Sequence, residues 1–231
     1  MENDPKVCSN YSPKYVKKTF PAIQSFPQSG NAIFTQPPQP FKCAGAPQKI
    51  MWIAHDIWNN ENKSPNIIFN SAAPGIFGAP KYAKELMKLV NSRNIEFSKE
   101  TNLTAVDPIK GNFKMNIQIF NRISGEAHFV KADGTLSIEN YDFLHVTPPQ
   151  RPVKALREDC NDITVGGFVN VDKYSMQHIK FDNIFSLGDC SNIPTSKTAA
   201  AVAAQHSIVA KNITNILNGK PLDSSYNGYT R

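Results

Sequence analysis

The chain has 231 residues, and its 25 lysines and arginines outnumber its 19 aspartates and glutamates to give a formal net charge of +6. This length accommodates one large or two small domains with a real hydrophobic core. Residues 1–115 carry 14 basic and 8 acidic side chains, whereas the remainder carries 11 of each. An anionic membrane surface or an anionic substrate would suit this excess. The basic side chains are scattered, however, so we expect a solvated surface and no nucleic-acid partner.

The cysteine pattern argues against a metal or disulfide scaffold. Cys8, Cys43, Cys160 and Cys190 include no C-x-x-C pair and no histidine at ligand spacing, so we expect no metal site. No apolar stretch approaches the roughly 20 residues that a membrane-spanning helix needs. The start of the chain resembles neither a signal peptide nor a transit peptide, so any organelle address is expected outside this sequence.

The first hundred residues predict a β-α-β arrangement after a polar start. Residues 1–30 are polar and interrupted by prolines, which indicates a connector with a short helix over 13–26. Apolar runs and three- and four-residue periodicity then predict elements in chain order: a strand at 31–35, a proline-rich crossing at 36–40, a helix over 46–59, a strand at 66–70, a helix over 80–92 and a strand at 95–98. Strands separated by single helices pair in parallel, as in a Rossmann-like half.

The turn between the strand at 66–70 and the helix at 80–92 argues against a nicotinamide cofactor. It has two glycines, Gly75 and Gly78, but lacks the G-x-G-x-x-G arrangement that lets a pyrophosphate contact the backbone. Strands predicted at 102–106, 114–120 and 127–131 then form an antiparallel excursion, the last two joined through residues 121–125. A buried strand follows at 141–147 and ends at Pro148-Pro149.

The last third of the chain carries the most informative stretch. An apolar run predicts a strand over 182–187, and Gly188 at its end allows close approach to a ligand. The carboxylate of Asp189 can accept a hydrogen bond from a ribityl or ribose hydroxyl. An alanine-rich helix predicted over 195–218 would aim its positive end at that ligand, with Lys197 in its first turn to neutralise an anion. A plain strand-to-helix turn with Lys197 in solvent is the alternative.

Three separated motifs resemble mitochondrial-type sulfide:quinone oxidoreductases, over nearly the whole chain from Tyr11 to Thr230. They are the segments Phe41-Lys42-Cys43-Ala44-Gly45-Ala46-Pro47-Gln48-Lys49-Ile50-Met51, Leu144-His145-Val146-Thr147-Pro148-Pro149 and Gly188-Asp189-Cys190 through Gln205. The resemblance implies an α/β fold: an incomplete tandem Rossmann-like flavoprotein fold with a parallel sheet and an antiparallel β excursion. The resemblance also implies three parts. Residues 1–35 would be a connector and remnant of the FAD domain, residues 36–149 a nicotinamide-type Rossmann-like domain without the dinucleotide fingerprint, and residues 150–231 the return segment of the FAD-binding domain.

The resemblance also implies a chemistry centred on Cys43. Hydrogen sulfide would form a persulfide on this cysteine, electrons would pass through FAD to ubiquinone, and the oxidised sulfur would leave on a small acceptor. A nearby helix N-terminus with Lys42 and Lys49 would favour the reactive thiolate, although a lone cysteine is more often an inert small hydrophobe. The residues implied to bind the cofactor are Gly188, Asp189, Thr195, Ser196, Lys197 and Thr198.

Two parts that the family needs have no counterpart in this sequence. The family has a G-x-G-x-x-G segment for the FAD pyrophosphate, and a second cysteine just beyond the motif that matches Tyr226-Asn227-Gly228-Tyr229-Thr230. We therefore expect a fragment lacking both ends, with a catalytically incomplete product as the alternative to a working enzyme. A related NADH:quinone-type flavoenzyme is a weaker alternative. A mitochondrial location with peripheral association to the inner membrane is implied by the resemblance alone.

Overall fold

The computed structural model describes residues 4–107 and 125–230, which form two compact units. Residues 1–39 and 44–149 make the first unit, and residues 40–43 and 150–231 make the second. Along the sequence, the chain therefore leaves the first unit for four residues, returns to it at Ala44, and enters the second unit again at Gln150.

A five-stranded parallel sheet is the framework of the first unit. Its strand order is β1-β8-β2-β3-β4, and every neighbouring pair is parallel. The long central pair runs in register from Ser29 opposite Ser64 to Gln36 opposite Ser71. The bounds of the five strands are β1 Val7–Cys8, β2 Ser29–Gln36, β3 Ser64–Ser71, β4 Glu96–Ser98 and β8 Phe143–His145. This arrangement confirms the predicted parallel α/β fold.

Helices cover one face of this sheet: α1 (Val16–Gln24), α2 (Gly45–Asn60) and α3 (Pro80–Ser92). Phe34 and Phe69 are register partners on β2 and β3, and they pack with Trp58 of α2 in a fully buried cluster. The indole N–H of Trp58 donates to the carbonyl oxygen of Ile23 at 2.8 Å, so this large side chain is buried without an unsatisfied donor.

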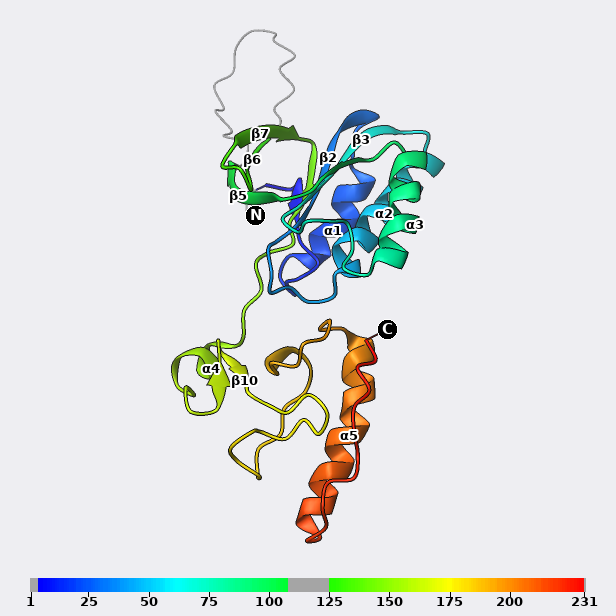
Figure 1. The fold of residues 1–231 in the computed structure, drawn as a ribbon. Helices are drawn as coiled ribbons and strands as arrows, with labels where there is room; N and C mark the ends of the chain where they lie inside the picture. The colour runs from blue at the N-terminus through cyan, green and yellow to red at the C-terminus, as the bar shows by residue number, and fades with distance from the viewer. Residues whose placement is uncertain (1–3, 108–124, 231) are drawn as a thin grey trace. The chain divides into compact units, whose positions relative to one another are not determined.

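An antiparallel three-stranded sheet packs against the other face (Figure 1). It consists of β5 (Thr101–Asp107), β6 (Gly125–Lys131) and β7 (Leu136–Tyr141) in that order. Ile33 and Ile68, which alternate with the phenylalanines along β2 and β3, join Phe129 and Tyr141 in a second buried cluster. The period-two alternation of strand side chains therefore gives the parallel sheet two apolar faces, each with its own cover.

The second unit has little sheet and is organised around one long helix. It contains α4 (Lys154–Glu158), a small antiparallel pair of β9 (Thr164–Val165) and β10 (Phe168–Val169), a 3-10 turn at Gly188–Cys190, and α5 (Ala199–Leu217). The residues after α5 run back along it (Figure 1), and the amide of Asn212 donates to the carbonyl oxygen of Ser224 at 2.9 Å. One buried apolar cluster of the unit consists of Val169, Val171, Met176, Ile193, Val209 and Tyr226.

Several sequence predictions are confirmed by these elements. The helices predicted over 46–59 and 80–92 are α2 and α3, the helix within 13–26 is α1, and β2, β3 and β4 lie at the predicted strands. The antiparallel excursion is also present. Its strand predicted at 114–120 and the junction at 121–125 lie mainly outside the described residues, and its third described strand, β7, was not predicted. The described helices include none with the length and apolar character to cross a membrane.

Two predictions near the candidate site were wrong. Residues 182–187 form no strand: a single bridge joins Phe185 to Gln177, because no longer strand lies alongside to complete a ladder among the described residues. The helix predicted from residue 195 begins at Ala199, because the hydroxyl oxygen of Thr198 accepts from the N–H of Ala201 and sets the N-cap there. Lys197 therefore precedes the helix instead of lying in its first turn.

His145 makes the stability of the first unit depend on pH. It lies fully buried in β8, its Nε2 accepts from the N–H of Asn10 at 3.2 Å, and its Nδ1 is buried with no partner among the described residues. Burial disfavours the charged imidazolium and lowers the pKa of His145 from 6.5 to about 4. Between these values the unfolded chain binds a proton that the folded chain does not bind.

We therefore expect the free energy of unfolding to be highest above pH 6.5, where His145 is neutral in both the folded and the unfolded chain. It should fall by about 1 kcal/mol per pH unit as the pH decreases from 6.5 toward 4. Urea denaturation of the wild type and of His145→Gln at pH 7.0, 6.0 and 5.0 measures this slope. His206→Gln, at an exposed position of α5, is the control and should keep the wild-type slope. Equal slopes in the wild type and His145→Gln would contradict the assignment.

Candidate functional site

A tight turn at Gly188 holds the candidate site against α5. Leu187 is extended, whereas Gly188 has a left-handed backbone with φ of +66°, which favours glycine. A Cβ added at Gly188 would lie 2.9 Å from Cγ2 of Val202. The N–H of Gly188 also donates to Oε1 of Gln205 at 2.8 Å. A hydrogen bond to α5 therefore fixes the backbone just before Asp189, and the close approach to Val202 leaves no room for a side chain at residue 188.

The carboxylate of Asp189 faces the segment that carries Cys43. Its side chain is 49% exposed, and Oδ2 lies 2.7 Å from Nζ of Lys42. An ion pair this exposed stabilises a fold by only about 0–1 kcal/mol. Its main effect is therefore to orient the two side chains rather than to hold the second unit together.

The segment 40–43 pairs with the residues just before α5. Lys42 and Lys197 form an isolated parallel bridge, and the N–H of Cys43 donates to the carbonyl oxygen of Lys197 at 3.0 Å. The N–H of Lys42 donates to Oε1 of Gln150. The structure thus brings the backbone of Cys43 next to the residue that precedes the N-cap of α5. Cys43 itself has φ of +46°, a left-handed conformation that is uncommon for a residue with a Cβ.

Lys197 is held by its surroundings instead of projecting freely into solvent. Its Nζ donates to the carbonyl oxygen of Ser191 at 2.6 Å and lies 4.8 Å from the centroid of the Phe168 ring. Partial burial lowers the pKa of Lys197, and the charge of Lys42 adds to this effect, whereas Asp189 and Cys190 oppose it. The predicted alternative of a fully solvated Lys197 is therefore wrong.

The other residues predicted to bind a cofactor have local structural roles in the second unit. The hydroxyl of Thr198 accepts from the N–H of Ala201 and donates to the carbonyl oxygen of Thr230 at 2.8 Å, so its bonding capacity is largely used within the chain. The N–H of Thr195 donates to the carbonyl oxygen of Ile193 at 2.8 Å, and the carbonyl oxygen of Ser196 accepts from the N–H of Thr198 at 3.0 Å.

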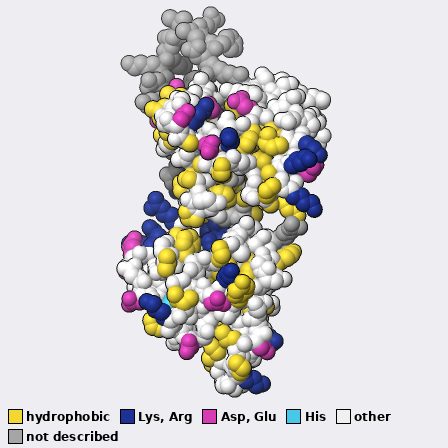
Figure 2. Space-filling view, in the orientation of Figure 1, with side chains coloured by type: hydrophobic (Ala, Val, Ile, Leu, Met, Phe, Trp, Pro, Cys, Tyr) yellow, Lys and Arg dark blue, Asp and Glu magenta, His cyan; other side chains and the backbone are white. Residues whose placement is uncertain are grey.

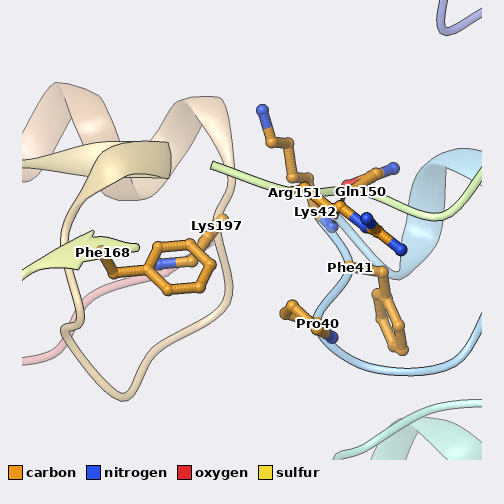
Figure 3. Close-up of a pocket in the computed structure, with 7 residues that line it drawn as sticks. All are labelled: Pro40, Phe41, Lys42, Gln150, Arg151, Phe168 and Lys197. Carbon is orange, nitrogen blue, oxygen red and sulfur yellow. Dashed lines mark hydrogen bonds between the residues drawn. The ribbon is translucent and has the colours of Figure 1, made fainter. Parts of the chain in front are cut away.

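Sequence reasoning missed three residues that line a pocket beside this segment (Figure 3). Gln150, Arg151 and Phe168 lie there together with Pro40, Phe41, Lys42 and Lys197. In the sequence, the only indication that Gln150 and Arg151 lie near the site is that they directly follow the motif ending at Pro149. Nothing in the sequence distinguishes Phe168 from an ordinary core residue.

The remaining cysteines differ in their environments. Cys8 is fully buried in β1, and desolvation raises the pKa of its thiol to about 12, so it stays protonated at neutral pH. Sγ of Cys190 lies 3.3 Å from Oγ of Ser186 and 3.3 Å from the carbonyl oxygen of Leu187. Cys160 is partly buried. All four cysteines are free thiols.

One group of potential metal ligands lies in the described part of the first unit, away from this segment in the sequence. Asp107, Glu126 and His128 each offer one ligand atom, and these atoms lie within 4.8 Å of one another. Nε2 of His128 is 3.0 Å from Oδ2 of Asp107, a contact that an ion pair between neighbouring strands also explains. The expectation of no metal site stays a prediction.

Comparison with known proteins shows which curated proteins the chain resembles. No family model matches the chain. The mitochondrial sulfide:quinone oxidoreductase of Mus musculus is 42% identical over 228 residues, which cover 98% of this chain and 48% of the mouse protein. The protein of the same name from Dictyostelium discoideum is 40% identical over 226 residues, covering 97% of this chain and 47% of that protein. This chain is related to the mitochondrial sulfide:quinone oxidoreductases.

The predicted resemblance to sulfide:quinone oxidoreductases is thereby confirmed, and the chain spans about half the length of the curated relatives it matches. A solved structure of the sulfide:quinone oxidoreductase from Aquifex aeolicus has a TM-score of 0.75 and covers 96% of this chain and 52% of its own. Because the sequence identity to that protein is 15%, this likeness shows the shared fold alone.

The position of Gly188 yields a stability prediction. Gly188→Ala would impose a side chain on a left-handed backbone and push it against Val202, so we expect the free energy of unfolding to fall by about 1–2 kcal/mol. Adding Val202→Ala should recover part of this loss, since it removes the clash but leaves the backbone strain.

Urea denaturation at neutral pH measures both effects. Gly45→Ala is the matched control, because a Cβ there meets nothing within 4 Å and the residue lies in the first turn of α2. It should change the stability by less than about 0.5 kcal/mol or increase it slightly. Equal losses from Gly188→Ala and Gly45→Ala would contradict the role assigned to the turn.

Proposed function

We propose that this chain supplies the sulfur-handling cysteine and part of the flavin site of a sulfide:quinone oxidoreductase. The observation that carries the proposal is the hydrogen bond from the N–H of Cys43 to the carbonyl oxygen of Lys197, beside the Lys42–Asp189 ion pair. It joins two separated motifs of a sequence that matches curated sulfide:quinone oxidoreductases over nearly its entire length.

The residues at the start of α5 fit a flavin cofactor, which we take to be FAD. The half-exposed carboxylate of Asp189 has acceptor capacity for a ribityl hydroxyl. The N-terminus of α5 carries a partial positive charge and presents backbone N–H groups that have no partner within the helix. The hydroxyl oxygen of Thr198 accepts from one of these, the N–H of Ala201. Gly188 keeps the backbone close to α5, so no side chain lies between the turn and the helix at that point.

Within this set we assign different roles to the proposed cofactor residues. Asp189 would act through its side chain, and Lys197 through its charge. Thr195 and Ser196 would act through the backbone, because they bridge the turn to the N-cap, and Thr198 would act as the cap that fixes the start of α5. When bound, FAD supplies a two-electron acceptor that passes its electrons to ubiquinone.

Cys43 would carry the sulfur in this proposal. Hydrosulfide attacks the sulfur of Cys43 in a disulfide with a second thiol, forming a new S–S bond while the second thiolate leaves with the electron pair. The product on Cys43 is a persulfide, whose outer sulfur is then transferred to a small nucleophilic acceptor. The net conversion of hydrogen sulfide and quinone to sulfane sulfur and quinol moves two electrons and two protons. Lys42 supplies a nearby positive charge for the approaching anion.

The family relation extends the proposal to location and domain roles. We propose that the enzyme acts in the mitochondrion, in peripheral association with the inner membrane where ubiquinone resides. In this arrangement residues 36–149 correspond to the nicotinamide-type domain and residues 150–231 to the return segment of the FAD-binding domain. Residues 1–35 correspond to the connector and remnant of the FAD domain.

A second candidate is that the 231-residue polypeptide alone is a catalytically incomplete part of that enzyme. The observation that favours it is that the match covers only 47–48% of the two animal and amoebal relatives. Both candidates use the same residues, and they differ in whether the isolated chain turns over sulfide.

The visible spectrum of the purified chain with added FAD tests the proposal. We expect bound flavin absorbance that bleaches when sulfide is added under anaerobic conditions, and we expect Cys43→Ser to retain the flavin but to lose the bleaching at least a hundredfold in rate. Cys160→Ser, a partly buried thiol in the same unit, is the control and should bleach at the wild-type rate.

The alternative outcomes separate the two candidates. A chain that binds FAD but is not bleached by sulfide, or that takes up no FAD, would support the incomplete module. Bleaching that survives Cys43→Ser would show that Cys43 does not carry the sulfur.

A further inference from the structure

The sequence contains two Asn-Gly dipeptides, at residues 218–219 and 227–228. Asparagine is a thermolabile residue, and a following glycine lacks the Cβ that would obstruct attack of its backbone nitrogen on the asparagine side chain. All four residues are exposed, and both glycines have a positive φ, +66° at Gly219 and +84° at Gly228. Sequence and exposure alone therefore predict similar reactivity at the two dipeptides.

Hydrogen bonds at the end of α5 protect the first dipeptide. Asn218 is the C-cap of this helix, and its Nδ2 donates to the carbonyl oxygen of Thr214 at 2.8 Å. The N–H of Gly219 donates to the carbonyl oxygen of Ile216 at 2.9 Å. Because this N–H must lose its proton before the nitrogen can attack the side chain of Asn218, its hydrogen bond opposes the reaction.

The second dipeptide has its attacking group free. The N–H of Gly228 has no hydrogen-bond partner among residues 4–107 and 125–230. The side chain of Asn227 instead closes a turn, in which its Oδ1 accepts from the N–H of Tyr229 at 3.1 Å. Water therefore has access to the proton that the nitrogen of Gly228 must lose.

The hydrogen bond to Asn227 lies on the atom where charge would develop. When the nitrogen of Gly228 attacks Cγ of Asn227, negative charge collects on Oδ1 in the tetrahedral intermediate. The N–H of Tyr229 already donates to this oxygen, so it would stabilise the charge as the donors of an oxyanion hole do. The two dipeptides thus differ at both reacting groups, the nucleophile and the carbonyl.

We propose that Asn227-Gly228 is a site of spontaneous deamidation in the folded chain, in preference to Asn218-Gly219. The nitrogen of Gly228 forms a bond to Cγ of Asn227, the Cγ–Nδ2 bond breaks, and ammonia leaves with the proton of the Gly228 N–H. Water then opens the five-membered imide at either carbonyl group, which leaves aspartate or isoaspartate at residue 227. Water is the single co-reactant, and the proposal does not rest on flavin binding or turnover.

The modification would act on the contacts between this turn and α5. Isoaspartate at residue 227 places Cβ in the main chain and lengthens it by one carbon. It would therefore shift the carbonyl oxygens of Tyr229 and Thr230, which accept from the hydroxyl groups of Tyr226 and Thr198. Because Thr198 is the N-cap of α5, the change would reach the start of that helix.

Incubation of the purified chain at neutral pH and physiological temperature, followed by peptide mapping with mass spectrometry, tests the site. Deamidation adds one mass unit, and isoaspartate is labelled by an isoaspartyl methyltransferase. We expect Asn227 of the folded chain to deamidate at least tenfold faster than Asn218. In concentrated guanidinium chloride the two rates should agree within threefold, because the hydrogen bonds that distinguish the dipeptides are lost.

Gly228→Ala and Gly219→Ala are matched variants, since both glycines have a positive φ and a Cβ at either position meets nothing within 4 Å. A methyl group at residue 228 obstructs the attacking nitrogen, so Gly228→Ala should slow deamidation of Asn227 at least fivefold. Gly219→Ala should leave the rate at Asn227 within twofold of the wild type.

Three results would overturn the proposal. The first is an Asn227 that stays intact in the folded chain or reacts no faster than Asn218. The second is the same ratio of the two rates in the folded and the denatured chain, which would mean that sequence alone sets the reactivity. The third is an unchanged rate in Gly228→Ala, which would indicate direct hydrolysis of the amide. The first two comparisons use the wild-type chain and do not depend on a variant folding.

Discussion

The functional interpretation depends on one short pairing, in which residues 40–43 lie beside the chain that leads into α5. A backbone bridge joins Lys42 to Lys197, and the N–H of Cys43 is bonded to the carbonyl oxygen of Lys197. Backbone hydrogen bonds specify position independently of side-chain identity, whereas the exposed Lys42–Asp189 ion pair contributes orientation. Without this pairing, the cysteine motif and the glycine-aspartate motif would be two unrelated sequence features.

The parts of the fold that the sequence predicted well are those with strong local signals. α3 begins at Pro80, where proline is favoured in the first turn, and its apolar residues repeat every three or four positions. The strand around Ile67 and Phe69 is a compact apolar run between polar residues, and it is β3, which pairs with the central strand β2 from Ser64 to Ser71. Such features require no knowledge of distant contacts.

The errors lie where distant contacts decide the backbone. β7 has exposed Leu136 and Ile138 on its outer face, so its alternation does not separate buried from solvated positions in the usual way. The apolar run before Gly188 has the composition of a strand but lacks a partner for a ladder. Lys197 was placed in a helix because the sequence does not show that it pairs with Lys42, 155 positions earlier.

The candidate site shows the same division. Cys43, Asp189 and Lys197 were found from motifs, whereas Gln150 and Arg151 became visible only when the pocket brought them beside Lys42. The assignments of Thr195, Ser196 and Thr198 to a cofactor stay predictions. Their contacts show that much of their bonding serves the turn and the N-cap of α5.

The assignment of residues 40–43 to the second unit places Cys43 at a point where the chain passes between the two units. The chain crosses between units at residues 39–40 and again at residues 43–44, so both flanks of the cysteine are covalently tethered to the other body. Cys43 is the last residue before the chain returns to the first unit, and its backbone has a left-handed φ of +46°. A change of backbone conformation at this one residue would therefore alter both its hydrogen bond to Lys197 and the path of the chain toward α2.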